Sequence, residues 1–164
     1  MSKSVKPCSS YQEWFFEDYQ KDNVIEMGPI YVEEDELIEF SLRYDPQPMH
    51  FNPEFAKKGP YKGLIASGWH TCALVMGELV KNYFSPSSSL GSPGIDELQW
   101  LNPVRPGDML TVRATILETK RSRSKPDRGL VSTMVEALNQ HQEKLVSFKA
   151  LNFMLRRKCS LEKT

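Results

Sequence analysis

Two side chains that can move protons, a carboxylate and an imidazole, stand five residues apart in the segment Tyr44–His50. They are Asp45 and His50, and two prolines lie between them. Proline fixes its own φ and keeps the preceding residue out of the helical region, so we expect Asp45 and Gln47 to be extended. The resulting stiff loop, residues 44–52, lets the two groups converge without following helix periodicity. This predicts general acid–base chemistry.

A third candidate is a backbone group. Gly68 follows His50 by 18 residues and stands at the predicted start of a long helix. The first N–H groups of a helix have no intrahelical acceptor, and the helix dipole favours negative charge there. Gly68 is therefore expected to offer its N–H to an oxygen that becomes negative during a reaction.

The segments that must position these groups begin with a short strand at Val24–Val32, interrupted at Gly28 and Pro29. A helix is predicted from Glu33 to about Arg43, and a brief one over Pro53–Lys58. The long helix starts at Ser67 or Gly68. It is apolar on nearly every face, which predicts that it is buried.

The rest of the chain alternates apolar and polar residues as strands do. A loop is expected at residues 85–94, and the predicted strands are Glu97–Leu101, Leu110–Ile116, Leu130–Leu138 and Leu145–Leu155. A hairpin turn at Asn139–Lys144 joins the last two. This order predicts an α+β fold in which an antiparallel sheet wraps around one helix.

Length and composition indicate one domain over residues 1–164, with an N-terminal extension of about residues 1–14 and a polar tail of about residues 156–164. The 21 basic and 21 acidic residues leave a formal charge of zero, which argues against nucleic acid as the main partner. No apolar run approaches the roughly 18 residues of a membrane span, and the first ten residues do not form a secretory signal. A cytoplasmic protein with no membrane association is expected.

Three cysteines, an odd number, stand far apart at Cys8, Cys72 and Cys159. They are expected to be free thiols. No pair of His or Cys residues has the spacing of metal ligands, so we predict no metal site. His70, inside the long helix, is expected to be a hydrogen-bonded core histidine, and His141 is expected to be exposed in a hairpin turn.

Two separated motifs resemble those of the MaoC-like dehydratases, a family that includes the R-specific enoyl-CoA hydratases and has the hotdog fold. Its signature, D-x-N-P followed by an aliphatic residue and H, is matched by Asp45, Pro48 and His50, while Gln47 and Met49 differ from it. Residues 65–68 resemble its I-x-H-G stretch, with Ser67 in place of histidine. Asn102–Asp108 resembles a sequence motif that members of the family have at the end of a strand. The likeness extends over about residues 15–153.

The resemblance implies a hydro-lyase of fatty acid metabolism that reversibly adds water to a trans-2-enoyl thioester, giving an (R)-3-hydroxyacyl thioester. Asp45 and His50 would be catalytic, Gly68 N–H would hold the thioester oxygen, and Gln47 and Ser67 would contact substrate. The substrate would be an acyl-CoA or an acyl carrier protein thioester, with no metal and no other cofactor. A homodimer or higher homo-oligomer is expected, because a hotdog sheet has an open edge strand.

Two other functions remain open at this point. An acyl-CoA thioesterase of the same fold would use a carboxylate on the central helix, for which Glu78 is the candidate. A non-catalytic acyl-CoA-binding protein is disfavoured by the intact Asp45 and His50.

A basic run lies in the predicted loop between the strands Leu110–Ile116 and Leu130–Leu138, at Lys120, Arg121, Arg123, Lys125 and Arg128. It is either a solvated hairpin tip or a clamp for coenzyme A phosphates in which Arg121 and Arg123 bind substrate.

Overall fold

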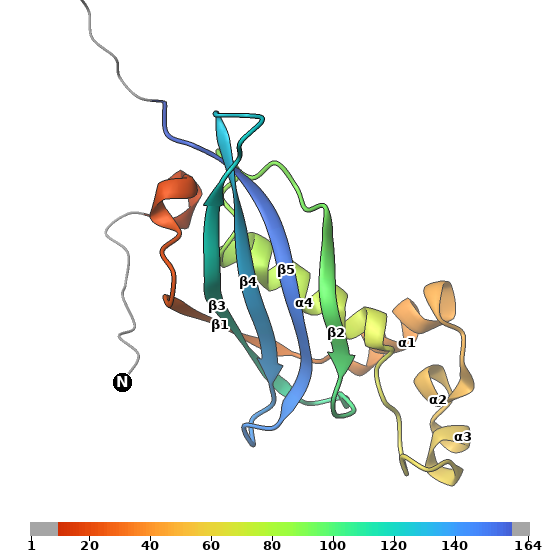
Figure 1. The fold of residues 1–164 in the computed structure, drawn as a ribbon. Helices are drawn as coiled ribbons and strands as arrows, with labels where there is room; N and C mark the ends of the chain where they lie inside the picture. The colour runs from red at the N-terminus through yellow and green to blue at the C-terminus, as the bar shows by residue number, and fades with distance from the viewer. Residues whose placement is uncertain (1–9, 159–164) are drawn as a thin grey trace, which may run out of the picture.

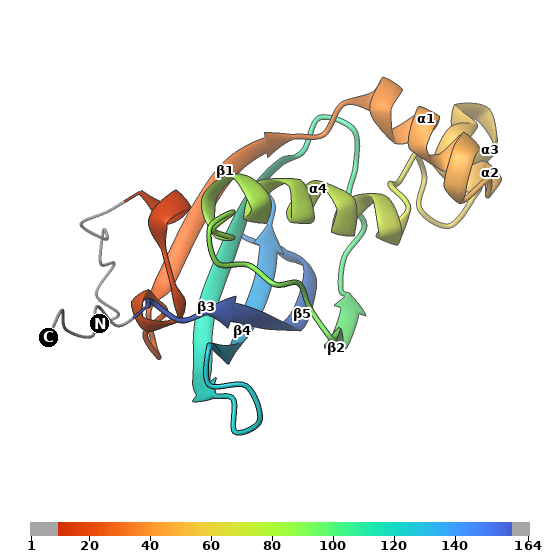
Figure 2. The ribbon, with the colours of Figure 1, turned by 90° about the horizontal axis from the view of Figure 1, so that it is seen from above.

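One antiparallel sheet and one long helix make up most of the molecule, as shown in the computed structural model, which describes residues 10–158 (Figure 1). The strand order is β1-β3-β4-β5-β2. The sheet curls around the helix, α4 (Gly68–Asn82), which lies across one face (Figure 2). The strands are β1 (Val24–Tyr31), β2 (Gly94–Trp100), β3 (Met109–Arg121), β4 (Arg128–Leu138) and β5 (Lys144–Leu155). This is the predicted α+β arrangement.

The core lies between α4 and the inner face of the sheet. Alternate residues of β3 point inward, and Val112, Ala114 and Ile116 are fully buried there. Val75 and Leu79, four residues apart on α4, pack against them in the same cluster. The inward residues of the strand, which recur every second position, therefore pack against the residues of one helical face of α4 in a single apolar layer.

Three short helices lie together at the end of the molecule where α4 begins (Figure 2). They are α1 (Glu34–Tyr44), α2 (Pro48–Phe51) and α3 (Pro53–Lys58). The predicted loop over residues 44–52 is therefore partly wrong, because proline is tolerated in the first turn of a helix and Pro48 begins α2. Asp45 and Gln47 are non-helical as predicted, with φ of −149° and −85°.

The prediction that α4 is buried all round is wrong. One side of the helix packs on the sheet, but Trp69, Met76 and Val80 on another side are 57%, 45% and 56% exposed. Apolar periodicity shows which faces avoid water, not what covers them. Among residues 10–158, nothing covers this face of α4.

Both ends of the described chain are held by side-chain contacts with distant segments. Trp14, in the predicted N-terminal extension, is buried, and its carbonyl accepts a hydrogen bond of 2.6 Å from the Ser88 hydroxyl. In the predicted tail, the Arg156 guanidinium pairs with Glu17 at 3.1 Å. Cys8 and Cys159 lie outside the described residues, and Cys72 is a half-buried free thiol.

Two hairpins join the last three strands. The turn at residues 139–144 forms as predicted, and His141 is exposed there. The hairpin between β3 and β4, which carries the basic run, lies at the end of the sheet opposite α1, α2 and α3 (Figure 1). Among residues 10–158, no helix is long and apolar enough to cross a membrane.

Candidate active site

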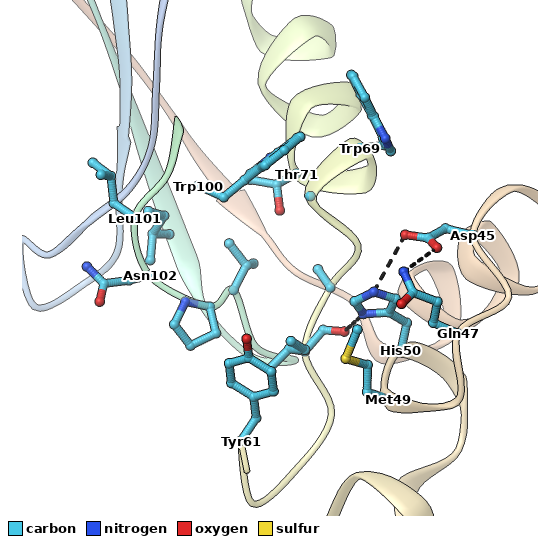
Figure 3. Close-up of a pocket in the computed structure, with 16 residues that line it drawn as sticks. Asp45, Gln47, Met49, His50, Tyr61, Trp69, Thr71, Trp100, Leu101 and Asn102 are labelled. Atoms are coloured by element: carbon cyan, nitrogen blue, oxygen red, sulfur yellow. Dashed lines mark hydrogen bonds and ion pairs between the residues drawn. The ribbon is translucent and has the colours of Figure 1, made fainter. Parts of the chain in front are cut away.

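A pocket of about 420 Å³ opens beside the first turn of α4, and both predicted proton-transfer residues line it (Figure 3). Its walls come from the α1–α2 corner, the segment before α4, the end of β2 and the connection to β3. The residues that line it are Asp45, Gln47, Met49, His50, Tyr61, Ile65, Ala66, Gly68, Trp69, Thr71, Trp100, Leu101, Asn102, Pro103, Val104 and Leu145.

Asp45 follows the last residue of α1, and each of its carboxylate oxygens accepts a hydrogen bond. The Ser67 hydroxyl donates to Oδ2 at 2.6 Å, and the Gln47 amide donates to Oδ1 at 2.8 Å. The bond from Ser67, and after it the bond from Gln47, lowers the pKa of Asp45, while partial burial opposes them. Asp45 is therefore held as a carboxylate.

His50 lies on α2 and is only 5% exposed. Its Nδ1 is 2.8 Å from the Ile65 carbonyl oxygen. A carbonyl can only accept, so Nδ1 carries a hydrogen and donates it. Nε2 is then the atom that can take up or release a proton, and it lies 3.5 Å from Asp45 Oδ2 (Figure 3).

Ser67 has two tasks in this arrangement. Besides donating to Asp45, its oxygen accepts the Trp69 N–H at 3.3 Å and so caps α4. One hydroxyl thus connects the carboxylate at the end of α1 with the start of α4.

Gly68 is the first residue of α4 and lines the pocket. The Trp100 ring lies so close that a Cβ on residue 68 would be 2.4 Å from it. Glycine is therefore required here for close packing. The Gly68 N–H is among the first donors of the helix, which have no intrahelical acceptor.

Sequence reasoning missed several walls of the pocket. Tyr61, Trp100 and Leu145 come from segments that are far apart in the chain, and no local spacing relates them. The Asn102–Asp108 motif gave a partial signal, since three of its residues line the pocket. Arg105 in this motif donates to the Tyr61 carbonyl at 2.7 Å and so helps to hold the Tyr61 segment in place.

Some predicted residues do not join the pocket. Arg121 and Arg123 lie on the distant hairpin (Figure 1), so a phosphate clamp at this site would need the hairpin of another subunit. Glu78 lines a different hollow and accepts a hydrogen bond of 2.6 Å from Asn82. Within residues 10–158, no three His, Cys, Asp or Glu side chains are grouped so that they could hold a metal ion.

Comparison with known proteins identifies the family of this chain. The model of the family described as "MaoC like domain" matches residues 17–138, most of the chain. The chain belongs to the MaoC-like domain family. Its fold is the hotdog fold that the motifs predicted.

Individual known proteins resemble the chain over most of its length. The crystal structure of the MaoC-like dehydratase from Rhodospirillum rubrum is 36% identical and superposes with a TM-score of 0.82, over 88% of this chain and 98% of that one. The R-hydratase PhaJ1 of Pseudomonas aeruginosa shares the fold at 22% identity, with a TM-score of 0.70 over 92% of each chain. The Bacillus subtilis (strain 168) protein named "Uncharacterized protein YdeM" is 25% identical over 129 residues, 79% of this chain and 90% of its own.

Proposed function

We propose that this MaoC-like protein is a hydro-lyase that adds water reversibly to a trans-2-enoyl thioester and yields an (R)-3-hydroxyacyl thioester. The observation that carries the proposal is the pair formed by Asp45 Oδ2 and His50 Nε2, 3.5 Å apart in the wall of the pocket. Membership of a dehydratase family and the likeness to an R-hydratase support it.

Asp45 and His50 have different roles in the proposed reaction. Asp45 has a lowered pKa, so it is a weak base and is better suited to hold the water and to stabilise an imidazolium. His50 Nε2 takes one proton from the water as the water oxygen bonds to C3 of the substrate. The same proton then passes from Nε2 to C2, so that H and OH have been added and His50 is neutral again.

Negative charge must move onto the thioester oxygen while water attacks. In the proposed complex this oxygen accepts the Gly68 N–H, where the helix dipole also favours negative charge. A donor of this kind commonly contributes about 3 kcal/mol to transition-state stabilisation. The proposed reaction needs no metal and no redox cofactor, and its substrate is a thioester of coenzyme A or of an acyl carrier protein.

The test is to mix the purified protein with trans-2-enoyl-CoA of several chain lengths and to follow two signals. We expect the conjugated thioester absorbance to fall without release of free thiol, and chiral analysis of the product to give the R form. Release of thiol at the rate of substrate loss would instead identify a thioesterase. No change in either signal with any chain length, and with acyl carrier protein thioesters as well, would contradict the proposal.

A further inference from the structure

His70 is a buried titratable residue that the proposed reaction does not use. The residue is 1% exposed, yet within the described chain neither ring nitrogen has a hydrogen-bond partner. The nearest acid is Glu36, whose Oε1 lies 3.9 Å from Nε2, too far for a hydrogen bond. The expectation of a hydrogen-bonded core histidine is thus correct for burial and wrong for bonding. Because buried polar groups are almost always paired, this exception needs an explanation.

The position of His70 connects it with the carboxylate of the active site. It is in the first turn of α4, three residues after Ser67, and its ring packs on Phe40 of α1 with centroids 4.9 Å apart. Phe40 in turn contacts Tyr44 at 5.0 Å, and Tyr44 is the residue before Asp45. His70 therefore lies where α1 rests on α4, and the two helices supply the two ends of the bond between Asp45 and Ser67.

There is room for α1 to shift relative to α4. A hollow of about 430 Å³ lies between α1, α4 and β1, and His70 and Phe40 line it. The ionisable groups around it are Glu36 from α1, Glu78 and Lys81 from α4, and Tyr31 from β1. The Glu36 side chain is 57% exposed, so it can move toward His70 without repacking the core.

Two acids on or next to α1 face a histidine at more than hydrogen-bond distance. Glu36 faces His70 at 3.9 Å, and Asp45 faces His50 at 3.5 Å. Catalytic contacts are often long in a free enzyme and shorten when substrate is bound. A small shift of α1 toward α4 would shorten the first contact and would carry Asp45 with it.

We propose that His70 is a positioning residue. By contacting Glu36 and Phe40, it fixes how α1 packs against α4, and thereby it fixes the position of the Asp45 carboxylate opposite His50. This inference rests on the proposed function for its catalytic consequence. A misplacement of about 1 Å in a catalytic group can lower turnover about 100-fold. His70 can therefore affect the rate through the position of α1, without touching the substrate.

The competing interpretation is that His70 only fills space. His70→Phe separates the two, because phenylalanine keeps the stacked ring and removes both unpaired nitrogens. Replacing an unsatisfied polar group by an apolar one of similar shape is neutral or stabilising. If His70 only fills space, the variant will be at least as heat-stable as the wild type and fully active.

If His70 positions Asp45, we expect His70→Phe to keep or raise Tm while kcat falls about 10- to 100-fold and KM changes less than about twofold. Glu36→Gln, at a side chain that is 57% exposed, is expected to lower kcat in the same way. The double variant should lose no more than the greater single loss, because both act through one contact. Glu39→Gln on the exposed side of α1 is the matched control and should leave kcat unchanged. Full turnover in His70→Phe, or in Glu36→Gln if His70→Phe does not fold, would overturn the proposal.

A measurement without substrate tests the same idea. The Asp45 carboxyl carbon is followed by NMR as the pH is lowered, with Asp45→Asn used to assign the signal. We expect the pKa of Asp45 to rise toward its ordinary value in His70→Phe, because a displaced α1 weakens the bond from Ser67. An unchanged titration would contradict the positioning role. This readout stands even if the wild type hydrates no thioester, which would count against the proposed function alone.

Discussion

At the scale of single residues, the site is a set of hydrogen bonds that fix protonation states. The Ile65 carbonyl holds the hydrogen on His50 Nδ1, and Ser67 and Gln47 hold Asp45 ionised. Both effects leave Nε2 of His50 as the atom where a proton can arrive and leave. Any change that removes one of these bonds should therefore alter the rate more than the fold.

The first prediction concerns the pair itself. Asp45→Asn and His50→Gln are each expected to lower the hydration rate at least about 100-fold, because His50 transfers the proton and Asp45 holds the water and stabilises the imidazolium. Both should keep the wild-type circular dichroism spectrum. Asp35→Asn, on an exposed side of α1, is the control and should retain full activity. Near-wild-type turnover in either site variant would rule out the two-residue mechanism.

A second prediction is the effect of pH on stability through His70. Burial lowers the pKa of this histidine in the folded protein, so the unfolded chain binds the proton more tightly. The free energy of unfolding should therefore decrease as the pH falls below about 6.5, the ordinary value for histidine. Urea denaturation at pH 8, 7, 6 and 5 measures this.

The comparison that assigns this pH effect is His70→Phe, which should remove that part of the pH dependence. Asp45 acts in a separate window. Its lowered pKa stabilises the fold above about pH 4, and that stability is lost only as the pH falls further. If His70→Phe loses stability between pH 7 and 5 as steeply as the wild type, groups other than His70 cause the pH dependence.

Sequence alone was sufficient for the residues whose relation is local. Asp45 and His50 are joined by a short proline-rich segment, so their convergence follows from backbone restrictions near them. Trp100 and Tyr61 could not be predicted as pocket walls, because only the packing of β2 and of the segment before α4 brings them together. The absence of hydrogen bonds to the His70 nitrogens could not be predicted from sequence either, because it depends on how α1 packs against α4.

At the scale of elements, the start of α4 is the most constrained point. Its first residue contacts the Trp100 ring of β2, its N-cap binds Asp45, and its first turn supports α1. Helix periodicity predicted that α4 exists and where it begins. It did not predict which side of α4 remains uncovered, because a pattern of apolar residues is the same for a core and for an interface.

Gly68→Ala tests this close packing. Alanine is the better helix former by about 1 kcal/mol, but its Cβ would be 2.4 Å from Trp100, so the ring or the helix must move. We expect Tm to fall and turnover to fall with it. Gly77→Ala in the same helix is the matched control, since nothing lies within 4 Å of the added atom, and it should raise Tm. A stabilised and fully active Gly68→Ala would show that the contact is unimportant.

At the scale of the whole molecule, β2 is an edge strand, and its last residue, Trp100, contacts Trp69 on the exposed side of α4. Ile95 on β2 and Met76 and Val80 on α4 are also exposed apolar side chains. Open strand edges and apolar faces favour association, which agrees with the expected homodimer. A second subunit is also what a phosphate clamp made from Arg121 and Arg123 would require.

We therefore predict that the protein is a dimer in light scattering at micromolar concentration. Val80→Glu should shift it toward monomer, because a charge on the apolar side of α4 disfavours its burial. Glu118→Gln on β3, away from this region, should have no effect on mass. A wild-type monomer under these conditions would contradict the prediction.

The two indole rings at the rim of the pocket have an optical consequence. Trp69 and Trp100 meet edge to face with centroids 5.4 Å apart, and both are half exposed, whereas Trp14, the third tryptophan of the chain, is buried. The emission of Trp69 and Trp100 depends on how much water surrounds them, and any molecule that fills the pocket displaces that water. The protein thus carries its own fluorescent reporter of occupancy, and a titration of intrinsic emission can measure affinity for thioesters that are never turned over.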